Sequence, residues 1–92
     1  MVAKNYVKPE KDEEFVGLCK KLVEASLKDE GCIDYGLYQD LENSGILTFL
    51  EEWKDEGSLD KHLNSSHFKE IFPLLSKCIE KETEINVYRK MM

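Results

Sequence analysis

The spacing of hydrophobic residues switches repeatedly between that of a strand and that of a helix. Val2–Val7 is rich in strand-forming residues and ends before Pro9, which cannot continue a strand ladder. In Lys11–Asp29 the apolar residues recur every three or four positions, which predicts an amphipathic helix. Ile33–Asp40 and Ile46–Lys54 are again strand-like, and the short turn between them predicts an antiparallel hairpin.

The second half of the chain repeats this change of spacing. Helical spacing returns in Leu59–Leu63 and, after a break, in His67–Ile79, where we expect Ser66 to cap the second helix. Pro73 lies inside that helix and predicts a kink or a restart. Glu84–Arg89 alternates once more and is predicted to be the last strand.

These elements follow one another in the order β-α-β-β-α-β. Each β-α-β half needs a right-handed crossover, so the helices of both halves cover the same face of one four-stranded antiparallel sheet. The sequence therefore predicts an α+β, ferredoxin-like fold. No linker, low-complexity run or internal repeat interrupts the 92 residues, so we expect a single domain over residues 1–92.

The strand predicted over Ile46–Lys54 carries apolar residues on both of its faces. Leu47 and Phe49 alternate with Ile46 and Leu50, whereas a sheet with one solvent-exposed side is polar on that side. We therefore expect a second copy of the chain to cover this side, which gives a homodimer with sheet facing sheet. The alternative is a monomer whose open face tolerates a few apolar side chains.

Charge and composition exclude several classes of partner. The chain has 13 basic and 19 acidic residues and a formal net charge of −6, whereas nucleic acids and anionic membranes attract basic surfaces. The longest apolar run, Ile46–Leu50, is far below the ~18 residues of a membrane span, and no signal-peptide layout precedes it. Cys19, Cys32 and Cys78 form no CxxC pair or Cys/His cluster. We expect a cytoplasmic protein with reduced thiols and with neither nucleic acid nor membrane as its partner.

The polar candidates for a functional site are few, and the chain has no GxGxxG, P-loop, GxSxG or HExxH motif, so we expect no cofactor and no metal. Asn5 shares a strand face with Ala3 and Val7, so its amide needs a hydrogen-bond partner from the protein or from a ligand. His62 lies on the apolar side of its helix and is either a packing residue or a base. His67 follows the predicted cap, where the helix dipole favours a neutral imidazole that can exchange a proton near pH 7. A capping or packing role is the alternative for His67.

Three aromatic residues are candidates for substrate binding. Trp53 ends its predicted strand and either walls a pocket or closes the core. Tyr35 and Tyr38 project to opposite faces of their strand, so at most one of them lines a given cavity, and we select Tyr35. Phe72 lies on the apolar stripe of the helix predicted over His67–Ile79 and is the third candidate.

Several segments, taken together, resemble the antibiotic biosynthesis monooxygenase family. Gly31–Asp40 (GCIDYGLYQD), Phe49–Asp55 (FLEEWKD) and Leu59–Phe68 (LDKHLNSSHF) are similar to the family patterns "GC…Y.LY.D", "E.W.." and "L..HL.S.HF", in the same order. Val7–Pro9 resembles the family's "VKPG", with Glu10 where glycine is common. The resemblance covers nearly the whole chain.

This resemblance implies a dimeric α+β barrel whose pocket lies between the sheet and its helices. Members are small enzymes, often free of cofactors, that oxidise quinols, anthrones or similar aromatic compounds with O2. Asn5 and Trp53 match pocket positions, and His62 and His67 match the histidines of the helical motif. By this analogy a neutral His67 or His62 takes a phenolic proton, Asn5 holds the oxyanion and Trp53 stacks on the substrate ring. A dimeric barrel that binds a small ligand or isomerises it is the alternative.

A heme-degrading branch of the same family resembles this chain less. That branch uses an asparagine on the first strand, a tryptophan in the helix and a histidine one turn further on. Asn5 could fill the first role, but the helical positions correspond to His62 and Phe72. Because the histidine ligand is missing, we do not expect heme binding.

Overall fold

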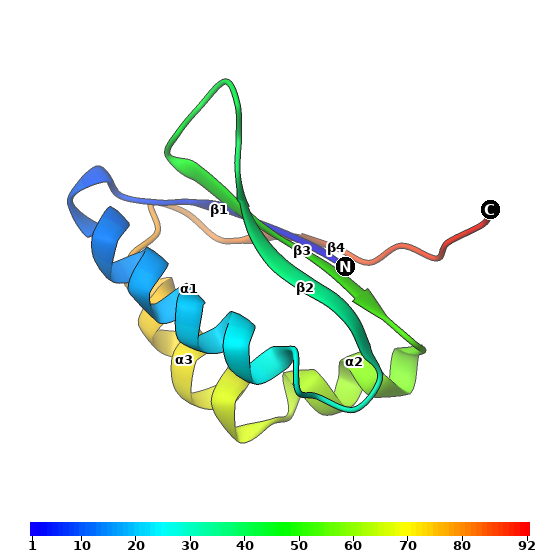
Figure 1. Cartoon of the computed structure of the whole chain (residues 1–92). Coiled ribbons are helices and arrows are strands. Elements are labelled where there is room, and N and C mark those ends of the chain that lie inside the picture. Colours follow the sequence, from blue (N-terminus) through cyan, green and yellow to red (C-terminus); the bar gives the residue numbers. More distant parts are fainter.

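The computed structural model describes all 92 residues and shows the predicted order of strands and helices (Figure 1). The strands form one antiparallel sheet in the order β2-β3-β1-β4, and α1 and α3 lie side by side on one face of it (Figure 1). The α+β, ferredoxin-like fold is therefore confirmed. The elements are β1 (Val2–Tyr6), the 3-10 helix η1 (Pro9–Lys11), α1 (Asp12–Ser26), β2 (Cys32–Gln39), β3 (Ile46–Trp53), α2 (Glu56–Leu63), α3 (Ser66–Ser76) and β4 (Glu84–Asn86).

The last strand is shorter than the predicted Glu84–Arg89. Asn86, the last residue of β4, pairs with Val2, the first residue of β1. A strand needs backbone groups of a partner strand opposite it, and β1 begins at Val2. The residues after Asn86 therefore leave the sheet as a tail, which projects away from the molecule in Figure 1.

The helix ends also differ in detail from the sequence predictions. The cap of α3 is Ser65 and not Ser66, because the Ser65 Oγ accepts a hydrogen bond from the Phe68 backbone N–H at 3.3 Å. No restart occurs at Pro73, since α3 continues through it to Ser76. None of the helices is long and apolar enough to cross a membrane.

The two faces of the sheet have different surroundings. The inner face carries Ala3, Val7, Tyr35, Leu47 and Phe49, which pack against buried residues of the helices. These helical residues are Phe15, Cys19 and Leu22 of α1, and Ile71 and Leu75 of α3. As predicted, Asn5 shares the inner face, and Tyr35 is buried there. The core of the protein thus lies between the sheet and the helix pair.

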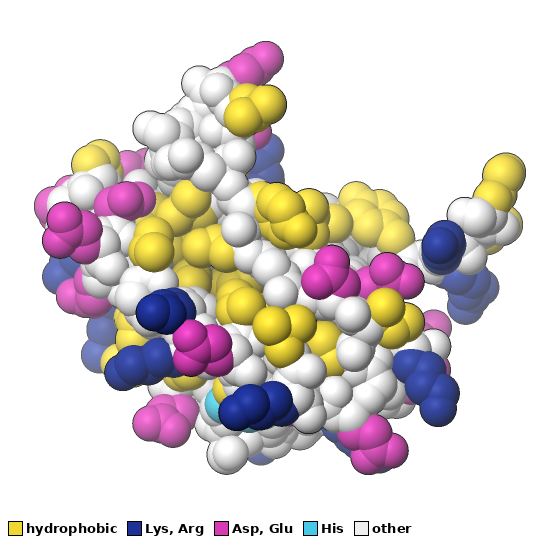
Figure 2. Space-filling view, viewed as in Figure 1, with side chains coloured by type: hydrophobic (Ala, Val, Ile, Leu, Met, Phe, Trp, Pro, Cys, Tyr) yellow, Lys and Arg dark blue, Asp and Glu magenta, His cyan; other side chains and the backbone are white.

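The outer face of the sheet is partly apolar and has no cover within one chain. Leu50 is 40% exposed and Tyr38 is 49% exposed, and Val87 and Tyr88 of the tail are also exposed. Figure 2 shows hydrophobic side chains at the surface over the strands. This face is where the sequence predicts a second copy of the chain.

Gly31 allows the chain to pass closely from α1 into β2. Its φ of +83° lies in the left-handed region, which residues with a side chain rarely adopt. A Cβ atom at this position would overlap the Ser58 side chain of α2. The glycine therefore keeps the end of the hairpin close to α2, where His62 lies.

Candidate functional site

A small hollow lies between the inner face of the sheet and the helices. Its volume is about 20 Å³, which is room for about one water molecule. Asn5, Tyr35 and Phe72, three of the predicted site residues, line it. The rest of its wall is mostly apolar and includes Leu22, Phe49, Phe68, Leu75 and Ile85, together with the polar side chains of Glu51 and Thr83.

Asn5 is buried in this wall, and protein groups bind all sides of its amide. Its Nδ2 donates hydrogen bonds to the backbone oxygens of Ala3 at 3.2 Å and Leu47 at 3.1 Å. Its Oδ1 accepts a hydrogen bond from the Thr83 hydroxyl at 2.8 Å. The partners are thus groups of β1, of β3 and of the segment before β4. To hold a substrate oxyanion, Asn5 would have to exchange one of its two backbone partners.

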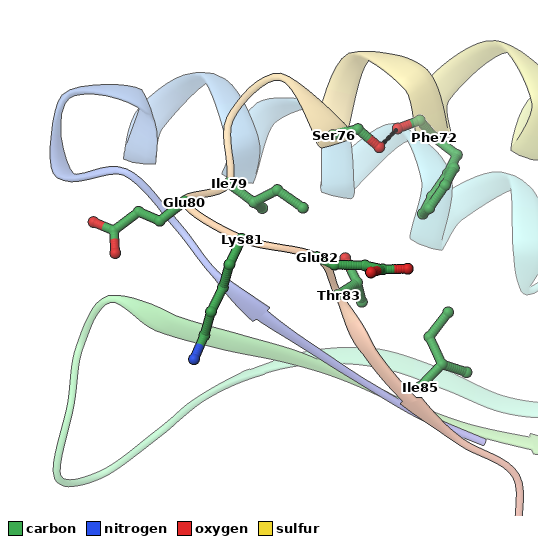
Figure 3. A pocket seen from close by; sticks show the side chains of 8 residues that line it. All are labelled: Phe72, Ser76, Ile79, Glu80, Lys81, Glu82, Thr83 and Ile85. Atoms are coloured by element: carbon green, nitrogen blue, oxygen red, sulfur yellow. Dashed lines mark hydrogen bonds between the residues drawn. The ribbon is translucent and has the colours of Figure 1, made fainter.

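An open groove adjoins the hollow and shares part of its wall. The groove has a volume of about 380 Å³, within the range of small-molecule sites, and is lined by Ser76, Ile79 and the segment Glu80–Thr83 (Figure 3). Phe72, Thr83 and Ile85 line both the groove and the hollow. In Figure 3 the Phe72 ring points from α3 toward the segment that carries Thr83. These side chains form the partition between an open space and a closed one.

The two predicted histidines share one carboxylate. His62 Nδ1 and His67 Nε2 each lie 2.9 Å from Oδ2 of Asp29, in the turn after α1. An ionised carboxylate only accepts hydrogen bonds, so both of these ring nitrogens donate. The other ring nitrogen of His62, Nε2, is buried without a hydrogen-bond partner. Burial lowers the pKa of His62 despite the opposing effect of Asp29, so its imidazole is neutral near pH 7.

Neither histidine lines the hollow or the groove. The ring of His62 is 1% exposed and is enclosed by aromatic rings, with centroid distances of 4.7 Å to Trp53, 5.3 Å to Tyr35 and 5.2 Å to Phe68. Tyr35 and Phe68 also line the hollow and therefore stand between it and the histidine. The structure thus divides the predicted site residues into two groups. Asn5, Tyr35 and Phe72 belong to the hollow, and Trp53, His62 and His67 belong to the histidine cluster.

Asp29, His62 and His67 also have the composition of a metal site. Their candidate ligand atoms lie within 4.8 Å of one another. The two ring nitrogens each lie 2.9 Å from the same Asp29 oxygen, which is a hydrogen-bond distance. The arrangement is that of a hydrogen-bonded triad, in which the carboxylate fixes the tautomer of both rings.

Glu51 is a residue of the hollow that the sequence analysis did not select. It lies on the inner face of β3, is 8% exposed and accepts a hydrogen bond on Oε1 from Trp53 Nε1 at 2.9 Å. Burial raises the pKa of this carboxyl, and the Trp53 hydrogen bond, the N-terminal ammonium and Tyr35 oppose this only in part. The alternation of β3 carries a signal for it, since Glu51 falls on the same face as Leu47, Phe49 and Trp53.

Comparisons with known proteins agree with this geometry. The sequence profile of the family "Antibiotic biosynthesis monooxygenase" matches residues 1–74. A conserved protein from Methanosarcina mazei Go1, whose crystal structure is known, is 74% identical, with a TM-score of 0.96 over 97% of this chain and 88% of that one.

Two curated relatives are more distant. "Uncharacterized protein sll1783" of Synechocystis is 34% identical over 83 residues, which are 90% of this chain and 56% of that protein. "Putative monooxygenase YcnE" of Bacillus subtilis is 38% identical over 63 residues, which are 68% of this chain and 66% of that protein. The chain thus spans just over half of the first relative and just under two thirds of the second.

Proposed function

Because the chain belongs to the antibiotic biosynthesis monooxygenase family, we propose that it oxidises a small electron-rich aromatic compound, a quinol or an anthrone, with O2 and without a bound cofactor. The observation that carries this proposal is the nearly closed, mostly apolar hollow with buried polar groups between sheet and helices. Such a site excludes water and presents few oriented polar groups, as expected for the binding of an aromatic ring.

The proposed substrate enters through the groove and displaces Phe72. The hollow of about 20 Å³ is too small for an aromatic ring, whereas the adjoining groove has about 380 Å³. Phe72 stacks on Phe68 at a centroid distance of 5.0 Å and lines both spaces. A change in the side-chain rotamer of Phe72 would join the two spaces, and the substrate ring would then take the place of Phe72 beside Phe68.

In the proposed reaction the substrate supplies all the electrons. Loss of a proton gives a substrate anion that reacts with O2. For an anthrone, one oxygen atom replaces the two hydrogens of the CH2 group and becomes a carbonyl, and the other leaves with those hydrogens as water. The developing oxyanion is held by Asn5, a contribution that is typically about 3 kcal/mol for one such donor. The family resemblance implies His67 or His62 as the base, but neither lines the hollow, and the rings of Tyr35 and Phe68 lie between the hollow and His62.

We also propose that two copies pair through the outer faces of their sheets in the cytoplasm. The exposed Leu50 and Tyr38 support this pairing, because contiguous apolar side chains on one face mark interaction sites. The three free cysteines support a reducing compartment. Sedimentation at micromolar concentration tests the dimer, and a single species with the mass of one chain would contradict it.

The test of the proposed activity follows oxygen uptake by the purified protein with menadiol or anthrone. We expect uptake well above the uncatalysed rate and unchanged by a chelator. With anthrone, the new carbonyl of the product should carry one 18O atom from 18O2. In Phe72→Trp the larger ring fills the partition, so kcat/KM should fall. In the matched variant Leu74→Trp the ring is added at an exposed position of α3, and kcat/KM should not change. Uptake at the background rate, with ligand-induced thermal stabilisation only, would overturn the proposal in favour of a binding protein.

A further inference from the structure

Glu51 is the one carboxylate among the side chains that line the hollow. We propose that Glu51 is a catalytic residue that accepts the phenolic proton of the substrate in the hollow and passes it to solvent. This inference rests on the proposed function, and it assigns the role of the base to a residue of β3 in place of the histidines. In this step the substrate O–H bond breaks, an O–H bond forms on Glu51, and the substrate oxygen keeps the electron pair.

The position of the carboxylate supports acceptance of a proton from the inside. Glu51 projects from the inner face of β3 and pairs in register with Tyr35 of β2, which also lines the hollow. Trp53 Nε1 holds Oε1 and so fixes the orientation of the carboxylate. Oε2 is left for a hydroxyl group, either that of Tyr35 or that of a substrate. No rearrangement of the histidine cluster is needed to bring this base to the substrate.

The position also supports release of the proton to the outside. Glu51 lines a second space, a groove of about 610 Å³ on the surface beside the end of β3 and the C-terminal tail. Glu51 and Met1 line both the closed hollow and this groove, and so connect the two spaces. A proton taken up in the hollow therefore reaches solvent through the same side chain, without passing the bound substrate.

Charged and polar groups approach Glu51 from several sides. The N-terminal ammonium of Met1, just before β1, donates to the Glu51 backbone oxygen at 2.8 Å, and from β2 Tyr35 and Cys32 interact with the carboxylate. The helices contribute apolar Leu22, Phe68 and Leu75. The outer groove adds charges of both signs, from Glu52, Lys54, Asp55, Glu56, Arg89 and Lys90. Burial is the largest effect and raises the pKa of Glu51, which makes the carboxylate a stronger base than an exposed one.

Glu24 offers a matched control. It carries the same side chain, is exposed on α1 and lines neither the hollow nor either groove. Glu51→Gln keeps the shape of the side chain and an oxygen for the Trp53 hydrogen bond but removes the base. Glu51→Asp keeps a carboxylate and withdraws it by one methylene group.

The experiment measures kcat and KM for menadiol from pH 4 to 9 in wild type, Glu51→Gln, Glu51→Asp and Glu24→Gln. We expect kcat to fall about 100-fold or more in Glu51→Gln, with KM within a few-fold of wild type, because a positioned base typically contributes about 10²–10⁴-fold. Glu51→Asp should keep part of the activity, with the rising limb of its pH profile displaced. Glu24→Gln should match wild type.

A second readout separates this inference from the proposed function. Wild type and Glu51→Gln are each mixed with p-nitrophenol in the absence of oxygen, at a pH below the pKa of the free phenol. The phenolate form absorbs in the visible range, so its formation can be followed directly. Wild type should ionise the bound phenol and Glu51→Gln should bind it un-ionised.

If wild type consumes oxygen while Glu51→Gln keeps its kcat and pH profile, Glu51 is not the base and the proposed function stands. If wild type consumes no oxygen but ionises the phenol through Glu51, the proposed function fails and the base assignment holds. Equal ionisation by the two proteins overturns the assignment, and Glu51→Asp decides it if Glu51→Gln does not fold.

Discussion

The hollow and the histidine cluster lie on either side of Tyr35 and Phe68 but are built for different tasks. In the cluster, His62 and His67 share Asp29, and aromatic rings enclose His62. In the hollow, a buried carboxylate and a buried carboxamide face an apolar space that adjoins an open groove. The residues most conspicuous in the sequence as possible bases, His62 and His67, therefore pack at the junction of α1, α2 and α3. The carboxylate that lines the hollow belongs instead to Glu51, in a strand.

The largest effect that would test this comparison is the loss of stability in His62→Ala. The variant removes a fully buried ring and leaves the Asp29 oxygen with one partner fewer, so we expect a loss of about 3–4 kcal/mol in the free energy of unfolding. Urea denaturation measures it. His67→Ala removes a ring that is 22% exposed and should cost about 1 kcal/mol. A cost below 1 kcal/mol for His62→Ala would show that the cluster is not a structural joint.

Local patterns in the sequence predicted the fold and the faces of the strands. The placement of Ala3, Asn5 and Val7 on the inner face follows from alternation alone, as does the opposition of Tyr35 and Tyr38. Element ends were less accurate, because the end of β4 is set by where its partner β1 begins. Local spacing does not contain that information.

The arrangement of the candidate site could be predicted only in part, for a related reason. Asp29 lies 33 residues from His62 and 38 from His67, so no spacing rule joins them. Similarly, Thr83 lies 78 residues from Asn5. Glu51 was visible as a carboxylate on an apolar strand face, but the closed hollow that makes it distinctive forms only when β1, β3 and both long helices pack together.

A smaller effect is expected when the hydrogen bonds of the hollow are removed. Asn5→Leu keeps the number and branching of the side-chain heavy atoms but deprives the Ala3 and Leu47 oxygens and the Thr83 hydroxyl of a partner, and it should cost about 2 kcal/mol. Thr83→Val removes one of these bonds and should cost about 1 kcal/mol. Because both variants remove the same Thr83–Asn5 bond, the double variant should cost less than the sum of the two. Urea denaturation of the four proteins measures this, and strict additivity would contradict the hydrogen bond between Asn5 and Thr83.

The smallest effect is a difference in how the two regions respond to pH. The folded pKa of Glu51 is raised above its ordinary value of 4.5, so its protonated form favours the folded state, and this contribution is lost as the pH rises through the folded pKa. The folded pKa of His62 is lowered below its ordinary value of 6.5, so the unfolded chain takes up this proton more readily, and stability falls as the pH drops below 6.5. The two groups therefore act in opposite directions on the free energy of unfolding.

Variants that keep the shape of each side chain separate the two contributions. Glu51→Gln should gain stability relative to wild type as the pH rises above 4.5, and His62→Phe should lose less than wild type as the pH falls below 6.5. A tenfold difference in proton affinity between the folded and unfolded states corresponds to about 1.4 kcal/mol, so urea unfolding at pH steps from 4 to 8 resolves both changes. If the difference in the free energy of unfolding between Glu51→Gln and wild type were independent of pH, the Glu51 carboxyl would titrate like an exposed one. The pH dependence of stability would then no longer support the proposed difference between the hollow, which contains the base, and the histidine cluster, which joins the helices.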